Sequence, residues 1–600
     1  MSAPAYAVGI DLGTTHSAVS WQRLDAAQGR GAAQQVLPIP QLTSPGTVEA
    51  KQLLPSFLYL PADGEFPAGA LELPGHKARG RLTGELARSH GAKVPGRLVA
   101  SAKSWLCHPG IDRRGAVLPW QAPADVSKLS PVDASAEYLG HLALAWNQQL
   151  GKDAPLKEQR VIITVPASFD AGARDLTLEA AKQAGLGDVT LLEEPQAALY
   201  AWLEAMGDGW RKQLKADDIL LVVDVGGGTS DFSLIGVKDE GGELALERLA
   251  VGDHILLGGD NMDLALAFRA NETFKAQGKT LDAWQLQALT YACRSAKETL
   301  LSRGDLDTVP VTVPSRGSSL MGGTLKTELT RAAVVEALVD GFFPRSKVDE
   351  GPQVARRTGL QQVGLPYATD AGITRHLSAF LTRQAEPLGE AGRIRKGSKL
   401  VRPTAVLFNG GAFKAQAFRE RILEVLRSWT GTDVRELPGA DFDLAVARGA
   451  ACYGWVKAGH GVRIRGGTAR SYYVGVEAAA LAVPGYTPPV KALCVAPFGM
   501  EEGTQADIPP QEFALLVGAP TSFRFFASST RRDAVGTLLD GTDELEELPA
   551  IEATLPGKSG GVVPVNLQAA VTELGALELR CLEQGGKGKW KLELNVRGAE

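Results

Sequence analysis

The chain is 600 residues long, more than one hydrophobic core usually serves, so about three or four domains or lobes are expected. Hydrophobic residues make up 44% of it and aromatic residues 6%, and the formal net charge is −5, as in a soluble globular protein. No block of like charge exceeds a few residues, so nucleic acid is not an expected partner. The chain starts without the basic and apolar pattern of a secretory signal, and no window approaches the ~18 apolar residues of a membrane span. We therefore expect a cytoplasmic protein without a membrane partner.

The first predicted element is a strand that runs into a glycine turn, "AVGIDLGTTHSAVS" at residues 7–20. Glycine lets backbone N–H groups close on phosphate oxygens, threonine adds hydroxyl donors, and a carboxylate can hold magnesium through water. The turn offers Asp11, Gly13, Thr14, Thr15 and His16 for this purpose. One such turn alone is also compatible with an ordinary hairpin.

Strands and helices then alternate along the chain. Residues 160–169, "RVIITVPASF", predict a buried strand, and residues 170–186 predict a helix with Asp170 as its cap and Gly185 as its terminator. Residues 189–203, "VTLLEEPQAALYAWL", predict a short strand that continues into a helix. This alternation is typical of an α/β sheet.

The stretch "ILLVVDVGGGTSDFSLIGV" at residues 219–237 repeats the first turn. An apolar strand again meets Asp-x-Gly, at Asp224 and Gly226, and a second apolar run follows Thr229. Two such units predict two lobes that are built alike and face each other. Together they could hold the phosphates of one nucleotide from opposite sides of a cleft.

The later elements change in character near residue 457. Residues 288–302 predict a helix, residues 404–429 a strand, a glycine turn and a helix, and residues 441–455 a helix whose small residues suit tight packing. Beyond them, short apolar or alternating runs broken by Pro and Gly predict a β-domain. The five cysteines are scattered and form no CxxC pair, which predicts structural thiols. They are Cys107, Cys293, Cys452, Cys494 and Cys581.

These motifs resemble those of the seventy-kilodalton heat-shock chaperones of the DnaK type, within the actin-like ATPase superfamily. The resemblance rests on "GIDLGTTHSAV", "VIITVPASFDAGAR", "LLEEPQAALYAWL", "VVDVGGGTSDFSL", "LLGGDNMD", "VLFNGGAFKAQAF" and "DFDLAVARGAA". Their order and spacing agree with the family from Tyr6 to Trp455, and the β-rich end resembles the family's substrate-binding domain more faintly.

The resemblance implies an α/β two-lobed, actin-like nucleotide-binding domain over residues 1–458, with a duplicated ribonuclease H-like fold. Lobe I would lie mainly in 1–215, lobe II mainly in 216–400, and a closing segment in 401–458. A linker would follow at 459–470, and a β-sandwich substrate-binding-like domain without a helical lid at 471–600.

The resemblance also assigns roles to individual residues. Asp11 and Asp224 would hold Mg²⁺ through water, and Glu194 and Asp231 would complete the catalytic network around the γ-phosphate. Pro166 and Arg174 would relay the nucleotide state to the other domain. The nucleotide-binding residues would be Gly13, Thr14, Thr15, His16, Gly226, Gly227, Gly228, Thr229, Gly258, Gly259, Lys297, Gly410, Gly411, Lys414 and Asp443.

The sequence departs from the family at the catalytic lysine, where Arg88 stands; Lys93 and Lys103 are near in sequence but do not align. Arginine keeps the charge but is bulkier and does not readily give up a proton, so hydrolysis is expected to be slow or rearranged. Four residues differ from those that the family has around the adenosine: Arg294, Glu298, Leu301 and Lys414. The selectivity of the site for adenine over other bases is therefore left open.

An extra segment between Phe343 and Arg402 includes a candidate helix, "GITRHLSAFLTRQ". This helix could rebuild part of the altered adenosine cage.

We therefore expect an ATP-binding chaperone and ATPase that uses ATP/ADP and Mg²⁺, with K⁺ as a further candidate ion. Nucleotide binding and hydrolysis would gate the binding of unfolded or extended polypeptide by the β-domain, with a co-chaperone or nucleotide-exchange partner. Two alternatives remain: a nucleotide-dependent scaffold or filament with weak or no hydrolysis, and a small-molecule kinase of the same superfamily.

Overall fold

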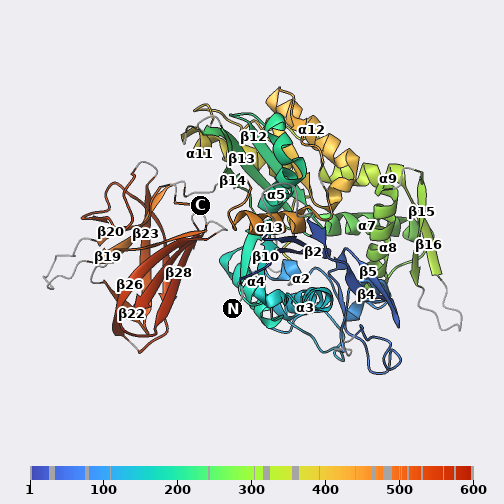
Figure 1. The fold of residues 1–600 in the computed structure, drawn as a ribbon. Helices are drawn as coiled ribbons and strands as arrows, with labels where there is room; N and C mark the ends of the chain where they lie inside the picture. The colour runs from blue at the N-terminus through green and yellow to red at the C-terminus, as the bar shows by residue number, and fades with distance from the viewer. Residues whose placement is uncertain are drawn as a thin grey trace. The chain divides into compact units, whose positions relative to one another are not determined.

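The computed structural model divides the chain into two compact units (Figure 1). Unit 1 comprises Met1–Leu244 and Leu249–Arg463, and unit 2 comprises Ala245–Arg248 and Ile464–Glu600. Much of the predicted linker at 459–470 lies outside the described residues. The described residues are all those of the chain except 1–2, 26–33, 75–79, 109, 241–242, 254, 303–304, 315–323, 354–363, 391, 393, 440, 462–463, 465–467, 469, 478–489, 499, 502, 510–512, 529–530, 559, 573–575 and 596–600.

The first sheet of unit 1 is built around β1 (Tyr6–Leu12), which pairs antiparallel with β2 (His16–Arg23) and parallel with β10 (Arg160–Val165). The parallel pairing sets Asp11 opposite Thr164, so the first glycine turn lies at the carboxyl ends of β1 and β10. The strand order is β11-β10-β1-β2-β3, with β6 also paired to β2. The added strands are β3 (Gln35–Val36), β6 (Leu54–Pro55) and β11 (Val189–Glu193).

The second sheet has the same arrangement around β12 (Ile219–Val225). This strand pairs antiparallel with β13 (Ser230–Glu240) and parallel with β17 (Ala405–Asn409), which sets Asp224 opposite Asn409. With β14 (Glu243–Val251) and β18 (Arg435–Glu436), the order is β14-β13-β12-β17-β18. The repeat predicted from the two turns is present in the strand pairing. We call the parts of unit 1 built on these sheets the first and second lobes.

Three helices position the site from the first lobe. α4 (Ala171–Gln183) is the predicted helix, and its predicted cap is confirmed because Asp170 accepts a hydrogen bond from the Ala173 N–H at 2.6 Å. α5 (Glu194–Met206) starts directly after β11, which puts Glu194 at the end of that strand. α13 (Ala445–Val456) is the last helix of unit 1, yet it returns to the first lobe and packs on β1 and α5, as Figure 1 shows beside the label β10.

The predicted tight packing of the closing helix is visible at two glycines, Gly449 of α13 and Gly9 of β1. A Cβ atom on Gly449 would lie 1.6 Å from the carbonyl oxygen of Ala197 in α5, and one on Gly9 would lie 2.2 Å from the carbonyl oxygen of Ala447. Only glycine permits these backbone approaches. The other elements of the first lobe are β4 (Ile39–Ser44), β5 (Thr47–Lys51), β7 (Leu58–Tyr59), β8 (Leu82–Thr83), α1 (Glu85–Gly91), β9 (Leu98–Val99), α2 (Ala102–Trp105), α3 (Pro131–Gln149) and α6 (Trp210–Gln213).

The candidate helix of the extra segment is present in the second lobe as α10 (Ile373–Arg383). Its apolar face enters the core of that lobe, where the ring of Phe380 stacks 5.9 Å from that of Phe232. The other elements of this lobe are α7 (Gly259–Ala276), α8 (Ala283–Ser302), β15 (Thr308–Pro314), β16 (Thr324–Thr330), α9 (Arg331–Val335), α11 (Ala385–Glu390) and α12 (Gln416–Thr430).

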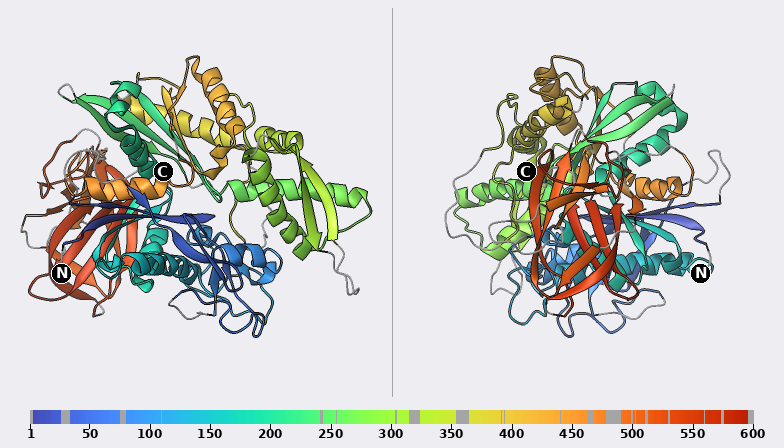
Figure 2. Two further views of the ribbon diagram at one scale, coloured as in Figure 1. Left: turned by 45° about the vertical axis from the view of Figure 1, so that its right-hand side comes forward. Right: turned by 90° about the vertical axis from the view of Figure 1, so that its left-hand side faces the viewer.

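The described part of unit 2 is β-rich, as the sequence predicts, and its orange and red strands are seen from two sides in Figure 2. Two sheets share one apolar core that includes Leu493, Phe525 and Leu577. One sheet has the order β24-β20-β19-β23-β25; in the other, β21 and β22 both pair with β26, which is followed by β27 and β28. The strands are β19 (Ser471–Glu477), β20 (Val490–Ala496), β21 (Thr504–Asp507), β22 (Phe513–Val517), β23 (Pro520–Ser528), β24 (Leu538–Leu539), β25 (Glu546–Thr554), β26 (Gly561–Val571), β27 (Ala576–Glu583) and β28 (Lys589–Asn595).

All five cysteines are free thiols, and all but Cys107 are buried. Burial raises the pKa of Cys494 to about 12, so this thiol is protonated and unreactive at neutral pH. Within the described part of the chain, no helix combines the length and the apolar character that a membrane crossing needs.

Candidate phosphate and nucleoside site

A cavity of about 380 Å³ in unit 1 is lined by both glycine turns. It extends from the ends of β1 and β12 to residues of α7, α8 and the loop after β17. Most of the residues predicted to bind nucleotide or metal meet here. Those that line the cavity are Asp11, Gly13, Thr14, Thr15, His16, Glu194, Asp224, Gly226, Gly227, Gly259, Lys297, Gly410, Gly411, Lys414 and Asp443.

The two turns approach each other so closely that glycine is required in the second. A Cβ atom on Gly227 would lie 1.8 Å from Oγ1 of Thr15, and one on Gly228 would lie 2.9 Å from Cγ2 of Thr14. The Thr15 hydroxyl is buried and has no hydrogen-bond partner among the described residues. A buried polar group of this kind calls for a partner, and a phosphate oxygen at the turn would supply one.

A third segment holds the second turn in place. The N–H of Gly259 donates to the Gly226 carbonyl at 3.0 Å, and the N–H of Asp260 donates to the Gly227 carbonyl at 2.7 Å. A Cβ atom on Gly258 would lie 2.8 Å from both carbonyl oxygens. The start of α7 therefore fixes the backbone of the turn, and the predicted residues Gly228, Thr229 and Gly258 lie outside the cavity lining.

Four carboxylates lie at or next to the end of the cavity formed by the strand ends: Asp224 and Asp231 are buried, and Asp11 and Glu194 are partly buried. Burial raises the pKa of Asp11 to about 7. Burial, with the charges of Glu194 and Asp231, raises the pKa of Asp224 well above its ordinary value, although Asn409 donates a hydrogen bond to it at 2.6 Å. Burial also raises the pKa of Asp231. A cation placed among these groups would lower their mutual repulsion.

The donor chemistry of this end fits Mg²⁺, which prefers carboxylate oxygens and keeps several of its waters. Among the described residues, no three His, Cys, Asp or Glu side chains converge closely enough to hold an ion directly.

The cation found at the acidic end is Lys103, a residue that the motif comparison left unassigned. It lies on α2, is 7% exposed and forms an ion pair with Glu194. Burial alone would lower the pKa of Lys103, but Glu194 and Asp11 raise it above the ordinary value. Nothing in the local sequence "SAKSW" distinguishes this lysine from a surface residue.

The prediction that Arg88 stands at the phosphates is not met. Arg88 lies on α1 and donates a hydrogen bond to Glu85 one helical turn away at 2.8 Å. It does not line the cavity and is 31% exposed. Its charge instead acts on His16, whose pKa is lowered to about 3 by burial first and then by Arg88, Arg294 and Lys414.

The nucleoside end of the cavity holds three further cations, each paired with a carboxylate. Arg294 pairs with Asp260 and Asp263, and Lys297 contacts Asp263 at 2.6 Å. Lys414 contacts Asp443 at 2.5 Å. The altered cage residues Glu298 and Leu301 also line this end.

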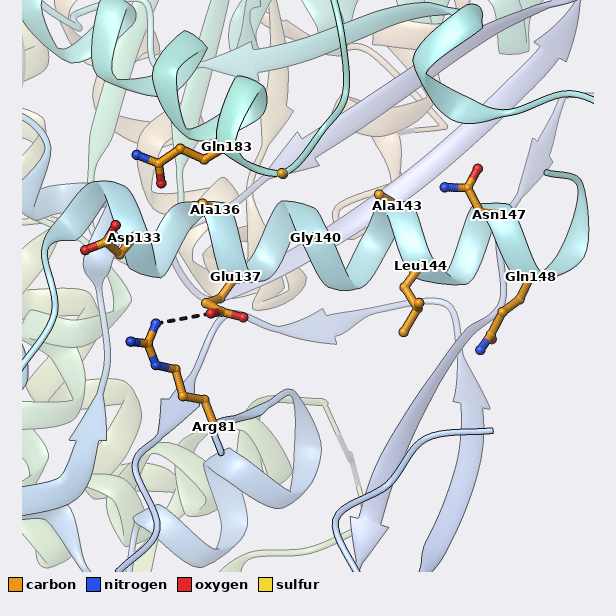
Figure 3. Close-up of a pocket in the computed structure, with 11 residues that line it drawn as sticks. Arg81, Asp133, Ala136, Glu137, Gly140, Ala143, Leu144, Asn147, Gln148 and Gln183 are labelled. Carbon is orange, nitrogen blue, oxygen red and sulfur yellow. Dashed lines mark hydrogen bonds and ion pairs between the residues drawn. The ribbon is translucent and has the colours of Figure 1, made fainter. Parts of the chain in front are cut away.

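A second cavity, of about 540 Å³, is a groove along α3 (Figure 3). Arg81 and Glu137 form an ion pair across it at 3.1 Å, and Gln183 of α4 faces the helix. None of the predicted site residues lines this groove, and it contains no glycine turn of the phosphate-binding type.

Comparison with known proteins finds one family. The model of the family described as "Hsp70 protein" matches residues 91–350. Over these residues the chain is similar to the Hsp70 family. Relatives include the chaperone protein HscA of Enterobacter sp. (strain 638), 32% identical over 44% of this chain and 37% of that protein. The HscA homolog of Bordetella pertussis is 31% identical over 59% of this chain and 49% of its own length, and the chaperone protein DnaK of Stenotrophomonas maltophilia is 30% identical over 56% and 49%. The chain therefore spans less than half the length of these relatives.

Similarity to the Hsp70 family implies an actin-like, two-lobed fold for unit 1, and its two sheets fit that architecture. The predicted relay residues Pro166 and Arg174 do not line the cavity: Pro166 follows β10, and Arg174 is a buried residue of α4. Ser168, two residues after Pro166, donates a hydrogen bond to Asp231 at 2.6 Å. Asp231 itself lies behind the second turn, outside the cavity lining.

The helix of the extra segment does not line the cavity, so the prediction that it rebuilds part of an adenosine cage is not supported. No described residue between 344 and 401 lines the cavity, because the apolar face of α10 is used in the core of the second lobe. The segment reaches the first lobe elsewhere: Nε2 of His108 lies 2.6 Å from the Gly364 carbonyl oxygen.

Proposed function

We propose that unit 1 binds and hydrolyses ATP with Mg²⁺, and that its nucleotide state gates the binding of extended polypeptide by unit 2. The observation that carries the proposal is the contact between the two glycine turns beside the Thr15 hydroxyl, which has no partner among the described residues, next to the cavity-lining carboxylates Asp11, Glu194 and Asp224. The backbone N–H groups of both turns would bind the phosphates, and the cavity end at Lys414 and Glu298 would receive the nucleoside. Unfolded polypeptides would be the clients, a co-chaperone or exchange factor the partner, and the cytoplasm the compartment.

In this proposal Asp11 and Asp224 hold Mg²⁺ through water, and the ion supplies charge neutralisation on the phosphates. The chain's own residues bind and orient the reactants. Glu194, fixed at the end of β11, orients the water that attacks the terminal phosphate, and Asp231, held by Ser168 behind the second turn, adds its charge to this network.

Asp224→Asn tests the catalytic part, because the change keeps the shape of the side chain and removes its charge. We expect the wild type to bind a fluorescent ATP analogue and to release phosphate with Mg²⁺, and Asp224→Asn to lose about a hundredfold or more in turnover. Glu137→Gln in the groove along α3 is the matched control and should retain turnover. A wild type that binds no ATP, or an Asp224→Asn variant with full turnover, contradicts the proposal.

The gating part is tested with a labelled extended apolar peptide and the full chain. We expect its fluorescence anisotropy to report different affinities with ATP and with ADP, since two coupled sites must influence each other. Equal affinities in the two nucleotide states contradict gating.

A nucleotide-dependent scaffold with weak hydrolysis is the second candidate. The ion pairs at the nucleoside end favour it, because Arg294, Lys297 and Lys414 already hold carboxylates and are less available to a base. Tight ATP binding without phosphate release would support this candidate.

A further inference from the structure

We propose that Glu298 binds the edge of the nucleotide base and that the nucleoside end of the cavity accepts guanine as well as adenine. GTP is then a ligand of unit 1 alongside ATP. This inference rests on the proposed nucleotide binding by unit 1, and it concerns which bases the site admits.

The first argument is the position of Glu298 on α8. Arg294, Glu298 and Leu301 follow one another at the spacing of a single helix face, and all three line the cavity. Glu298 is an exposed residue of this face. Its carboxylate can therefore turn towards a base without breaking a contact in the core.

The second argument is that Glu298 has no counter-ion, in contrast to its charged neighbours. Each of the three cations at the nucleoside end already pairs with an aspartate. Among the described residues, no cation pairs with Glu298, and the Ser302 hydroxyl donates to its backbone carbonyl at 2.6 Å, not to its carboxylate. Both carboxylate oxygens are therefore available as acceptors, and an ionised carboxylate donates no hydrogen bond.

The third argument is that the rest of this end is apolar or already engaged. Leu301 and Phe442 line it, and the Phe442 ring is held by the guanidinium of Arg419, 5.3 Å from the ring centre. Each described side-chain donor that lines this end already donates to a protein oxygen: Arg294, Lys297, Lys414 and Ser302. Apolar walls distinguish poorly between two purines of similar shape. The choice of base is therefore left to the carboxylate of Glu298.

A carboxylate suits the edge of guanine better than that of adenine. Guanine presents two adjacent donors, the ring N1–H and the N2 amino group, and the two oxygens of a carboxylate accept both in parallel. Adenine presents one donor, its N6 amino group, beside the lone pair of N1, which the second carboxylate oxygen would repel. The apolar walls bind either purine, and Glu298 compensates guanine for any poorer fit.

The test measures dissociation constants for ATP, GTP and ITP with Mg²⁺ and the full chain, by competition with a fluorescent nucleotide. We expect the dissociation constant for GTP to be equal to or lower than that for ATP. ITP keeps N1–H but lacks the N2 amino group, so it should bind the wild type about tenfold more weakly than GTP. In Glu298→Ala, GTP and ITP should bind equally.

Glu298→Gln makes the sharper variant, because an amide offers one acceptor and one donor and so matches the edge of adenine. The ratio of the two dissociation constants should shift about tenfold in favour of ATP. A general effect of the lost charge on nucleotide affinity cancels in this ratio. Glu272→Gln, an exposed residue of α7 that pairs with Lys275 and does not line the cavity, is the matched control and should keep the wild-type ratio.

A wild type that binds GTP about threefold or more weakly than ATP overturns the inference and leaves the proposed function standing. A Glu298→Gln variant with the wild-type ratio also overturns it, as does equal binding of GTP and ITP by the wild type. A wild type that binds neither ATP nor GTP instead refutes the proposed function.

Discussion

Ser168 of the first lobe donates a hydrogen bond to Asp231 of the second lobe at 2.6 Å. Ser168 lies in the loop after β10, two residues beyond Pro166, and Asp231 lies on β13 beside Asp224 in the strand register. One short polar contact thus joins the loop of the predicted relay to a carboxylate next to the second turn.

Ser168→Ala should lower the hydrolysis rate about tenfold, because a hydrogen bond to a charged group contributes about 1.5–3 kcal/mol and Asp231 keeps its bond to Thr229. Phosphate release measures the effect. Ser168→Thr retains the hydroxyl and is the matched control. If Ser168→Ala hydrolyses ATP at the wild-type rate, the hydrogen bond from this loop does not contribute to catalysis.

His108→Ala should speed ADP release about fivefold, since it removes one hydrogen bond between the first lobe and the extra segment. The Gly110 N–H donates to Nδ1 of His108 at 3.0 Å, so Nε2 carries the proton that is donated to Gly364. The extra segment is in turn bound to the second lobe, where the Ala368 N–H donates to the Leu256 carbonyl at 3.1 Å. Stopped-flow displacement of labelled ADP measures the rate.

The control for His108 is Arg345→Gln, which alters an exposed ion pair with Glu424 in the same segment. It should release ADP at the wild-type rate. Unchanged release in His108→Ala would mean that this contact does not restrain the lobes.

Gly449→Ala should destabilise unit 1 by about 3 kcal/mol or more, because the added methyl group would lie 1.6 Å from a backbone oxygen of α5. It should also slow hydrolysis, since α5 carries Glu194 at its first position. Gly341→Ala, with no atom within 4 Å of the new Cβ, should stay within about 0.5 kcal/mol of the wild type. Denaturant unfolding compares the two. Equal stability of the variants would contradict the close packing.

His16→Asn should reduce the loss of stability at acid pH. Burial and three nearby cations lower the pKa of His16 from an ordinary 6.5 to about 3, so between these values the unfolded chain binds a proton that the folded chain does not. Stability therefore falls as the pH drops below 6.5, by about 2 kcal/mol from this group at pH 5. Thermal unfolding at pH 7.5 and pH 5 should show a larger decrease for the wild type than for His16→Asn. If the wild type and His16→Asn lose equal stability between pH 7.5 and pH 5, titratable groups other than His16 cause the loss at acid pH.

The two glycine turns were predictable because strand, acid and glycine are adjacent in sequence, and each hairpin folds on its own strand pair. The cap at Asp170 was predictable for the same reason. The position of Lys103 was not, since it depends on the left-handed turn at Ser101 and on a contact with Asp260 far along the chain. The position of Arg88 in the sequence predicted that it lies at the phosphates. On α1, however, its side chain points towards Glu85 and donates a hydrogen bond to it.

The helix of the extra segment shows a related limit. The apolar periodicity of α10 predicts a buried face but not what covers it. Ile373, Leu377 and Phe380 pack in the core of the second lobe, so the helix has no apolar face left for the adenosine cage.

The return of α13 to the first lobe has a consequence for synthesis of the protein. β1 leaves the ribosome long before α13, the helix that packs against its glycine. Until α13 has been synthesised, nothing packs against the backbone around Gly9. The first lobe therefore cannot complete its packing before the second lobe has been synthesised. Ribosome-bound chains that end before Ala445 therefore lack a finished first lobe, and the unit closes in one late step.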